Sequence, residues 1–292
     1  MSKGRMTIVV TIKNEEDSID SLMESIMAQT LKPDEVIVAM AISNDETEKI
    51  LNSYKKKIIG LRVLKIGDKN RSVGRNMAIA ASKADVIAVT DAGCILDKNW
   101  LKEITKPILS GRAESVAGYY RIKTDNEFQK SMAPFLAVMP DKLDKKTYLA
   151  SSRSVAFTRK AWQEAGKYDE GNSYSEDIAF GQSLKSKTKN VVSDKAMVEW
   201  AMPSTLDEFF HKVANYARGD VKVWYSPHIR KIASMWARYL VFVVLPPLFV
   251  VYLVWATGRN YDYVRSKWAL VYIPILRVVT DVAIMWGSLT AK

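Results

Sequence analysis

Short apolar runs recur along the first part of the chain, and segments with the apolar spacing of helices lie between them. The runs have the length of buried strands, and we place them at Thr7–Ile12, Glu35–Ala39, Leu61–Ile66, Asp85–Thr90 and Ser115–Tyr119. Apolar residues three and four positions apart predict helices, as from Ile19 to Ile26 and within Lys98–Leu109. Strands that alternate with helices predict right-handed βαβ units and a doubly wound α/β domain with a mostly parallel sheet.

The alternation stops at Arg121–Leu149, where two prolines and a run of charges predict an insertion or mobile loop. It resumes with a strand at Arg153–Thr158 and a short helix at Arg159–Gly166. A further helix is expected to begin at Ser175, which suits an N-cap because two acidic residues follow it in the first turn.

The last third of the chain has a different pattern. Thr205–Tyr216 is amphipathic, and cations then alternate with aromatic residues, a mixture typical of a membrane–water interface. This basic belt comprises Lys212, Arg218, Lys222, Arg230, Lys231 and Arg238, with Trp224, Tyr225, Trp236 and Tyr239. Tyr239–Thr257 then runs without a charge and approaches the length that crosses a bilayer, with a kink expected at its two prolines.

A second apolar segment, Trp268–Trp286, contains only Arg277 and Asp281 as charged residues, four apart and able to pair on one helix face. We expect a membrane hairpin. Basic residues in the joining loop keep open a re-entrant or interfacial hairpin, and a soluble helix packed on the body is a further alternative. These patterns predict three parts: an α/β domain at 1–203, amphipathic interface helices at 204–237 and the hairpin at 238–292.

Composition narrows the possible partners. Apolar residues make up 48% of the chain, enough for a full core, and the net charge is +11. The cations gather just before the apolar tail, which favours an anionic membrane surface over nucleic acid, and no nucleic-acid-binding signature is present. Cys94 is the single cysteine, so no internal disulfide can form. We therefore expect a protein of the cell membrane whose catalytic domain is cytoplasmic.

Candidate chemistry lies where two of the predicted strands end. Asp85–Thr90 is followed at once by Asp91, Ala92 and Gly93, a carboxylate beside two small residues. The first strand ends at Lys13, Asn14 and Glu15, at a strand-to-helix turn. In an open α/β sheet, ligands bind beyond the carboxyl ends of the strands, and a helix N-terminus attracts phosphate. A nucleotide site at this edge is therefore expected.

The order of several short motifs resembles that of family 2 glycosyltransferases over about residues 6 to 220. The motifs are Thr-Ile-Lys-Asn-Glu-Glu at 11–16, Ser-Asn-Asp-Glu-Thr at 43–47, Gly-Arg-Asn-Met-Ala at 74–78, Asp-Ala-Gly at 91–93, Gly-Lys-Tyr-Asp-Glu at 166–170 and Ser-Glu-Asp at 175–177. Each motif is short, and their shared order and spacing carry the resemblance.

The resemblance implies a GT-A-type α/β domain that transfers a sugar, with inversion, from a nucleoside diphosphate donor to an acceptor hydroxyl. Asp177 would match the catalytic base, with Glu176 beside it. Asp91 would match the first acid of an Asp-x-Asp motif that contacts the donor. The donor-binding residues implied in this way are Asn14, Glu15, Asp45, Arg75, Asn76, Asp91, Ala92 and Gly93.

Two positions depart from the family pattern. Met40-Ala41 stands where an acid for the nucleobase and ribose is usual, and Gly93 replaces the last acid of Asp-x-Asp. A divalent cation, Mn²⁺ or Mg²⁺, is still expected because the diphosphate leaving group gains charge. Asp91 is the best candidate for its ligand, and Asp97 is a weaker one.

Arg218, in Tyr-Ala-Arg-Gly at 216–219, resembles an arginine that related membrane enzymes place near the diphosphate. It fits equally well as a member of the basic belt. The acceptor is expected to be lipid-linked, because the tail would hold the active site at the bilayer. Two alternatives remain: a polyprenyl-phosphate sugar synthase, and a catalytically silent homologue that binds a sugar nucleotide.

Overall fold

The computed structural model describes residues 4–172, 174–224 and 226–291, so Tyr225 of the basic belt lies outside the described residues. The chain divides into two compact units. The first comprises Met1–Arg121 and Asp144–Trp200, and the second comprises Ile122–Leu143 and Ala201–Lys292. The predicted boundaries at residues 203 and 237 stay predictions.

Four parallel strands form one half of the sheet in the first unit. They are β1 (Met6–Ile12), β2 (Glu35–Met40), β3 (Leu61–Lys65) and β4 (Val86–Asp91), arranged in the order β3-β2-β1-β4. All six residues of β2 are buried, as expected for a strand covered on both faces. The predicted parallel pairing is therefore confirmed for these strands.

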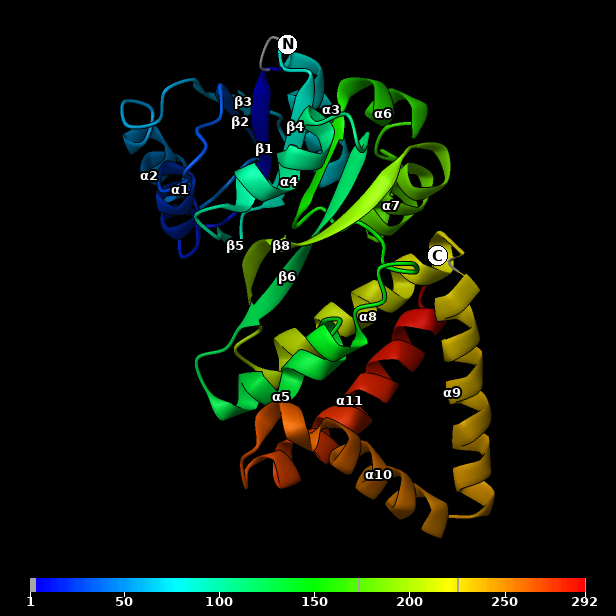
Figure 1. Cartoon of the computed structure of the whole chain (residues 1–292). Helices are drawn as coiled ribbons and strands as arrows, with labels where there is room; N and C mark the ends of the chain where they lie inside the picture. The colour runs from blue at the N-terminus through cyan, green and yellow to red at the C-terminus, as the bar shows by residue number, and fades with distance from the viewer. Residues whose placement is uncertain (1–3, 173, 225, 292) are drawn as a thin grey trace. The chain divides into compact units, whose positions relative to one another are not determined.

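Helices connect these strands and cover the sheet (Figure 1). The connecting helices are α1 (Ile19–Met27), α2 (Thr47–Ser53) and α3 (Arg71–Ala81), and α4 (Trp100–Leu109) follows β4 and leads into the other half of the sheet. Close approach of α3 to the sheet depends on Gly74, since a Cβ there would lie 2.9 Å from Ile66 Cδ1 and 3.2 Å from Thr11 Cγ2. The glycine of the Gly-Arg-Asn motif thus brings the N-terminal half of α3 onto β1.

The other half of the sheet is antiparallel where pairing is defined. It contains β5 (Cys94–Leu96), β6 (Ser115–Lys123), β7 (Val155–Thr158) and β8 (Asn190–Ala201). Strand β7 lies between β4 and β6 and is antiparallel to both. Because of this, β6 runs in the same direction as β4, as a βαβ crossover requires, without being its neighbour. The sequence did not predict β5 or β8.

Two helices follow β7 in the first unit, α6 (Arg159–Glu164) and α7 (Glu176–Lys187). Ser175 does occupy the N-cap position of α7, but its side chain makes no capping hydrogen bond. Its backbone is left-handed, with φ +55°, which costs a residue with a side chain about 1–2 kcal/mol. This turn places Glu176 and Asp177 at the start of the helix.

The second unit is helical. Its elements are α5 (Glu127–Leu136), the short helix η1 (Pro140–Lys142), α8 (Leu206–Lys222), α9 (Ser226–Val244), α10 (Pro247–Val264) and α11 (Ala269–Leu289). The predicted loop at Arg121–Leu149 is wrong in part, because it contains α5. The Asn126 side chain caps α5 by accepting from Gln129 N, and Phe128 packs edge-on against Tyr272.

The apolar run Tyr239–Thr257 is not one helix. It is divided between α9 and α10, which are separated at Leu245 and Pro246. Proline has no amide hydrogen to donate and its ring clashes with the preceding turn, so two in succession end the helix instead of only bending it. Among the described residues, one helix, α11, is long and apolar enough to cross a membrane.

Helices α8 and α11 pack closely through small residues (Figure 1). A Cβ added at Gly287 of α11 would lie 2.3 Å from the Ala214 carbonyl oxygen and 2.9 Å from Ala217 Cβ. By contrast, a Cβ at Gly258 of α10 would meet nothing within 4 Å. The contact between the two helices therefore requires glycine at 287.

We expect Gly287→Ala to lower the free energy of unfolding by about 1–3 kcal/mol, because the added methyl group must push the two helices apart. Gly258→Ala is the matched control, and it should be neutral or stabilising by up to about 1 kcal/mol through helix propensity. Thermal unfolding of both full-length variants in detergent measures the difference. Equal melting temperatures would show that the α8–α11 contact is not close-packed.

Candidate active site

The carboxyl ends of β1, β2 and β4 meet at one edge of the sheet, and the predicted residues follow these ends. Thr11 pairs with Ala39 on one side and with Asp91 on the other. The turn after β1 is tied to the loop after β2, since the Asn14 amide donates to Ser43 Oγ and the Asn44 amide donates to Asn14 Oδ1. The sequence prediction of a shared edge is confirmed.

Glu15 and Asp45 belong to the same group of contacts. The Glu15 amide donates to Thr47 Oγ1 at 2.7 Å, and the Glu16 amide donates to Asp45 Oδ2 at 3.2 Å. Hydrogen bonds from Thr47 and Glu16 hold the pKa of the Asp45 carboxyl below its usual value. Met40 and Ala41, which stand where the family usually has an acid, are buried. The first acidic residue after β2 is Asp45. Donor contacts from these residues stay predictions.

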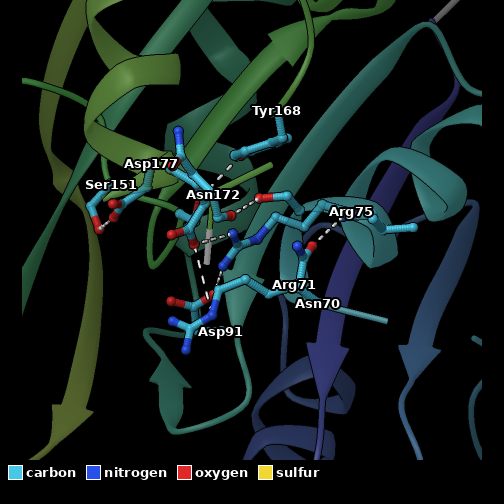
Figure 2. Close-up of polar contacts among 12 residues, drawn as sticks. Asn70, Arg71, Arg75, Asp91, Ser151, Tyr168, Asn172 and Asp177 are labelled. Carbon is cyan, nitrogen blue, oxygen red and sulfur yellow. Dashed lines mark hydrogen bonds and ion pairs between the residues drawn. The ribbon is translucent and has the colours of Figure 1, made fainter. Parts of the chain in front are cut away.

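A buried arginine links the end of β4 to the start of α7 (Figure 2). Arg75 of α3 is 1% exposed, and its guanidinium donates to Asp91 Oδ1 at 2.7 Å and to Glu176 Oε1 at 2.8 Å. Arg71, one turn earlier on α3, lies 3.9 Å from Glu176 and is half exposed. Three segments far apart in the sequence are thus joined at one guanidinium.

The two carboxyls of this cluster respond differently to their surroundings. Burial alone would raise the pKa of Asp91, but the charges of Arg75, Arg153 and Arg71 outweigh burial and hold it below its usual value. For Glu176, burial and the neighbouring Asp177 raise the pKa in spite of Arg75. Asp91, whose side chain is 27% exposed, is therefore the carboxylate best suited to remain charged and reach a ligand.

Asn76 has a structural part in the same region. Its amide donates to the Tyr168 carbonyl and to Glu170 Oε1, and its Oδ1 accepts from Trp162 Nε1 and the Tyr168 amide. The segment after α6 is thereby fixed to α3, and the Tyr168 ring lies 5.2 Å from the Arg75 guanidinium. Contact between Asn76 and a donor stays a prediction.

Asp177 is held by a hydroxyl. Ser151 Oγ donates to Asp177 Oδ2 at 3.0 Å and accepts from Arg153 Nη1 at 3.0 Å. The Arg153 guanidinium stacks on Trp200, 3.9 Å from the ring centroid, which fixes its position. Asp177 is partly exposed, and its Oδ1 accepts from the Ile178 amide, whereas Glu176 is buried against Arg75. A catalytic role for either acid stays a prediction.

The described residues contain no group of three or more His, Cys, Asp or Glu side chains arranged to hold a metal ion. Asp91 offers one carboxylate, of which Oδ1 already accepts from Arg75. A Cβ at Gly93 would meet nothing within 4 Å, so the missing second acid is not excluded by space. One carboxylate completed by substrate phosphates and water is a usual arrangement for Mg²⁺.

Arg218 belongs to the second unit. There its Nε donates to Thr290 Oγ1 and its Nη1 to Asn215 Oδ1. These bonds order the side chain within α8 and the end of α11, and its predicted role at the diphosphate stays a prediction.

Sequence reasoning missed Ser151 and Arg153. They lie in Ser-Ser-Arg-Ser at 151–154, just before β7, where neither periodicity nor a motif marks them. Arg71 was also missed, although its spacing of four residues from Arg75 on a helix is a signal that both point to one side.

A protein-family model described as "Glycosyl transferase family 2" matches residues 7–165, slightly more than half of the chain. The matched segment includes β1, Arg75 and Asp91, and it ends before Glu176 and Asp177. Comparison with curated proteins found no match.

Solved structures share the fold at low sequence identity. The mannosyltransferase PcManGT from Pyrobaculum calidifontis, in complex with GDP-Man and Mn²⁺, is 14% identical with a TM-score of 0.70, covering 100% of this chain and 89% of that one. TarS residues 1–349 from S. aureus, in complex with UDP-GlcNAc, is 16% identical with a TM-score of 0.56, covering 98% and 91%. Against a larger S. aureus TarS structure, identity is 17%, the TM-score is 0.56, and the match covers 74% of this chain and 39% of that one.

We expect Arg75→Gln to lower the free energy of unfolding by about 3–5 kcal/mol near neutral pH, because Glu176 would be left buried without its main counter-charge and the partly exposed Asp91 would lose its ion pair. Burial would then hold the pKa of the Glu176 carboxyl still further above its unfolded value. The folded state would bind more protons than the unfolded state, so part of the stability should return as the pH falls. Denaturant unfolding at about pH 7 and about pH 5 measures both effects.

Arg71→Gln is the control, since Arg71 is half exposed and lies 3.9 Å from Glu176. Its effect should stay below about 1 kcal/mol. If the two variants were equally stable, the buried contacts of Arg75 would not hold the site together.

Proposed function

Because the chain belongs to glycosyl transferase family 2, we propose that it moves a sugar, with inversion, from a nucleoside diphosphate donor to an acceptor hydroxyl. One observation carries this proposal. The partly exposed Asp91 and the start of α7, where Asp177 lies, are fixed to one another through Arg75 and Glu176. A donor-side acid and a candidate base on the acceptor side are thus set in one rigid cluster.

The donor would bind along the edge formed by the ends of β1, β2 and β4. The turns that contain Asn14 and Asp45 are joined there by hydrogen bonds. Asp91 is suited to remain charged, because the charges of three arginines lower its pKa by more than burial raises it. Two of the similar structures are complexes with GDP-Man and with UDP-GlcNAc, which supports a nucleotide-sugar donor. With Met40 and Ala41 in place of an acid, Asp45 is the nearest carboxylate after β2.

Asp177 would act as the general base. An acceptor hydroxyl becomes a better nucleophile as it loses its proton, and a positioned carboxylate can accept that proton during attack on the anomeric carbon. Attack opposite the leaving diphosphate in a single displacement inverts that carbon. Both oxygens of Asp177 accept one hydrogen bond, Oδ2 from Ser151 Oγ and Oδ1 from the Ile178 amide. These bonds would orient the carboxylate, and each oxygen keeps a lone pair that could receive the proton.

A divalent cation, Mn²⁺ or Mg²⁺, would be held by Asp91 together with the donor diphosphate, and it would stabilise the charge of the leaving group. The Mn²⁺ in the PcManGT structure supports this assignment. Arg71, half exposed beside Glu176, supplies positive charge on the same side of α3 as Arg75.

We place the protein at the cytoplasmic face of the cell membrane, with a lipid-linked acceptor. Large apolar side chains on α9, α10 and α11 are widely exposed, including Val243 at 80%, Val254 at 68% and Leu289 at 71%. Contiguous apolar surface of this kind marks a partner or a membrane, and cations precede it in the sequence. A polyprenyl-phosphate sugar synthase would use the same surface, with a phosphate in place of the acceptor hydroxyl.

We expect Asp177→Asn to reduce sugar transfer by a factor of about 10²–10⁴ while donor affinity changes little, because the base acts on the acceptor alone. Transfer with a radiolabelled nucleotide sugar and donor binding by calorimetry are measured on the same preparation. The control is Asp194→Asn, which removes an exposed carboxylate paired with Lys145. Unchanged turnover in Asp177→Asn would remove Asp177 from the mechanism, and absence of nucleotide-sugar binding to the wild type would remove the proposed function.

We expect the full-length protein to stay with membranes washed in molar salt and to need detergent for release. Apolar burial is insensitive to screening, whereas adsorption through basic residues alone is worth about 1 kcal/mol each and is lost at high salt. A chain ending before Arg238 keeps most of the basic belt and should be released by salt. Sedimentation of washed membranes distinguishes the two. Release of the full-length protein by salt would show that α9–α11 do not insert.

A further inference from the structure

The second unit contains a cavity of about 450 Å³, and none of the residues that line it is a candidate residue of the sugar-transfer site. It lies among the end of α5, η1, α9, α10 and α11, all elements of this unit. A cavity of this volume is in the range that holds a small ligand or a lipid headgroup. Tyr263 helps to shape it, because its hydroxyl donates to Asp141 and so ties η1 to α10.

Four cationic side chains line this cavity: Lys142, Lys231, Arg259 and Arg277. Two of them are compensated. Lys142 lies 3.0 Å from Asp141, and Arg277 is paired with the fully buried Asp281. Lys231 and Arg259 have no ion-pair partner among the described residues. The cavity therefore carries about two uncompensated positive charges, which matches the charge of a phosphate monoester near neutral pH.

Buried contacts fix the innermost cation. Asp281 accepts hydrogen bonds from Tyr252 at 2.8 Å and Tyr239 at 3.0 Å, and Arg277 donates to it through Nε at 3.2 Å. With Oδ2 of Asp281 shared in this way, the Arg277 guanidinium is held in place before any ligand arrives. A preordered guanidinium loses less freedom when it binds an anion.

The walls of the cavity are apolar and aromatic. Phe135 and Trp255 line it, and the Arg259 guanidinium lies 5.3 Å from the Trp255 ring centroid. Trp255 also belongs to an exposed apolar face of α10, where Val251 is 61% and Val254 is 68% exposed. A hydrocarbon chain leaving the cavity would therefore meet apolar surface, and its charged end would meet cations.

We propose that this cavity binds the phosphate group of an anionic lipid, with Lys231, Arg259 and Arg277 as its ligands. The phosphate would lie among the three cations and the lipid chain along Val251, Val254 and Trp255. Charge and apolar surface are combined here as they are at a membrane interface, where an aromatic ring lies beside a cation. None of these three cations is assigned a part in the proposed sugar transfer.

The test uses full-length protein in a neutral detergent, titrated with dodecyl phosphate and, separately, with inorganic phosphate, by calorimetry. Wild-type protein should bind dodecyl phosphate saturably and inorganic phosphate at least about tenfold more weakly. Lys231→Gln/Arg259→Gln should weaken dodecyl phosphate binding by at least about tenfold, or about 1.4 kcal/mol. Lys222→Gln/Arg265→Gln is the matched control, which removes the same charge from exposed residues that do not line the cavity.

Equal losses in the two double variants would show general attraction to basic protein, and the proposal would be wrong. Inorganic phosphate that binds as tightly as dodecyl phosphate would mean an anion site without a lipid. Arg259→Lys keeps the charge and should bind almost as the wild type does; a loss as large as in Arg259→Gln would show that charge is not recognised. Nucleotide-sugar binding is measured on the same samples, so failure of sugar transfer and failure of the lipid site are distinguishable.

Discussion

The candidate site depends on one buried guanidinium. Arg75 joins the end of β4 to the start of α7 through Asp91 and Glu176, and a buried charge of this kind is tolerated only when it is paired. Glu176 is itself buried and depends on Arg75 for its counter-charge, while the partly exposed Asp91 holds the same guanidinium at the sheet edge. The geometry of the sheet edge and the position of α7 therefore depend on the same buried contacts of Arg75.

This arrangement also gives the neighbouring acids Glu176 and Asp177 different surroundings. Glu176 balances Arg75 in the interior, and Asp177, one residue later, is partly exposed and is oriented by Ser151 and the Ile178 amide. Successive residues at a helix start point in different directions, so a single Glu-Asp pair can supply both a structural counter-charge and a candidate base. The left-handed backbone of Ser175 is the conformational cost of beginning the helix at this point.

The second unit also contains a buried charged group, the carboxylate of Asp281, which is held by cations and hydroxyls. Asp281 is fully buried in α11, a helix whose one other charged residue is Arg277, and it is surrounded by Arg277, Arg238 and two tyrosine hydroxyls. Buried polar groups of this type are maintained only when they are satisfied by partners. Here the partners come from α9, α10 and α11, so the cluster specifies how these helices pack while their outer faces remain apolar.

The sequence by itself determined six strands of the first unit, β1 to β4, β6 and β7, and its helices α1, α4, α6 and α7, because buried strands need continuous apolar runs and helices need an apolar face; it did not reveal β5 or β8. It also placed Asn14 and Asp91 at one sheet edge, since parallel strands end together. It could not show that β7 inserts between β4 and β6. Nor could it show that residues 127–136 form a helix that packs against the C-terminal helices, or that two prolines divide the apolar run into two helices. Nor could it show the contacts Arg75–Glu176 and Ser151–Asp177, which join residues 101 and 26 positions apart. Local patterns record which face of an element is buried, whereas pairings over such distances are decided only when the whole chain packs.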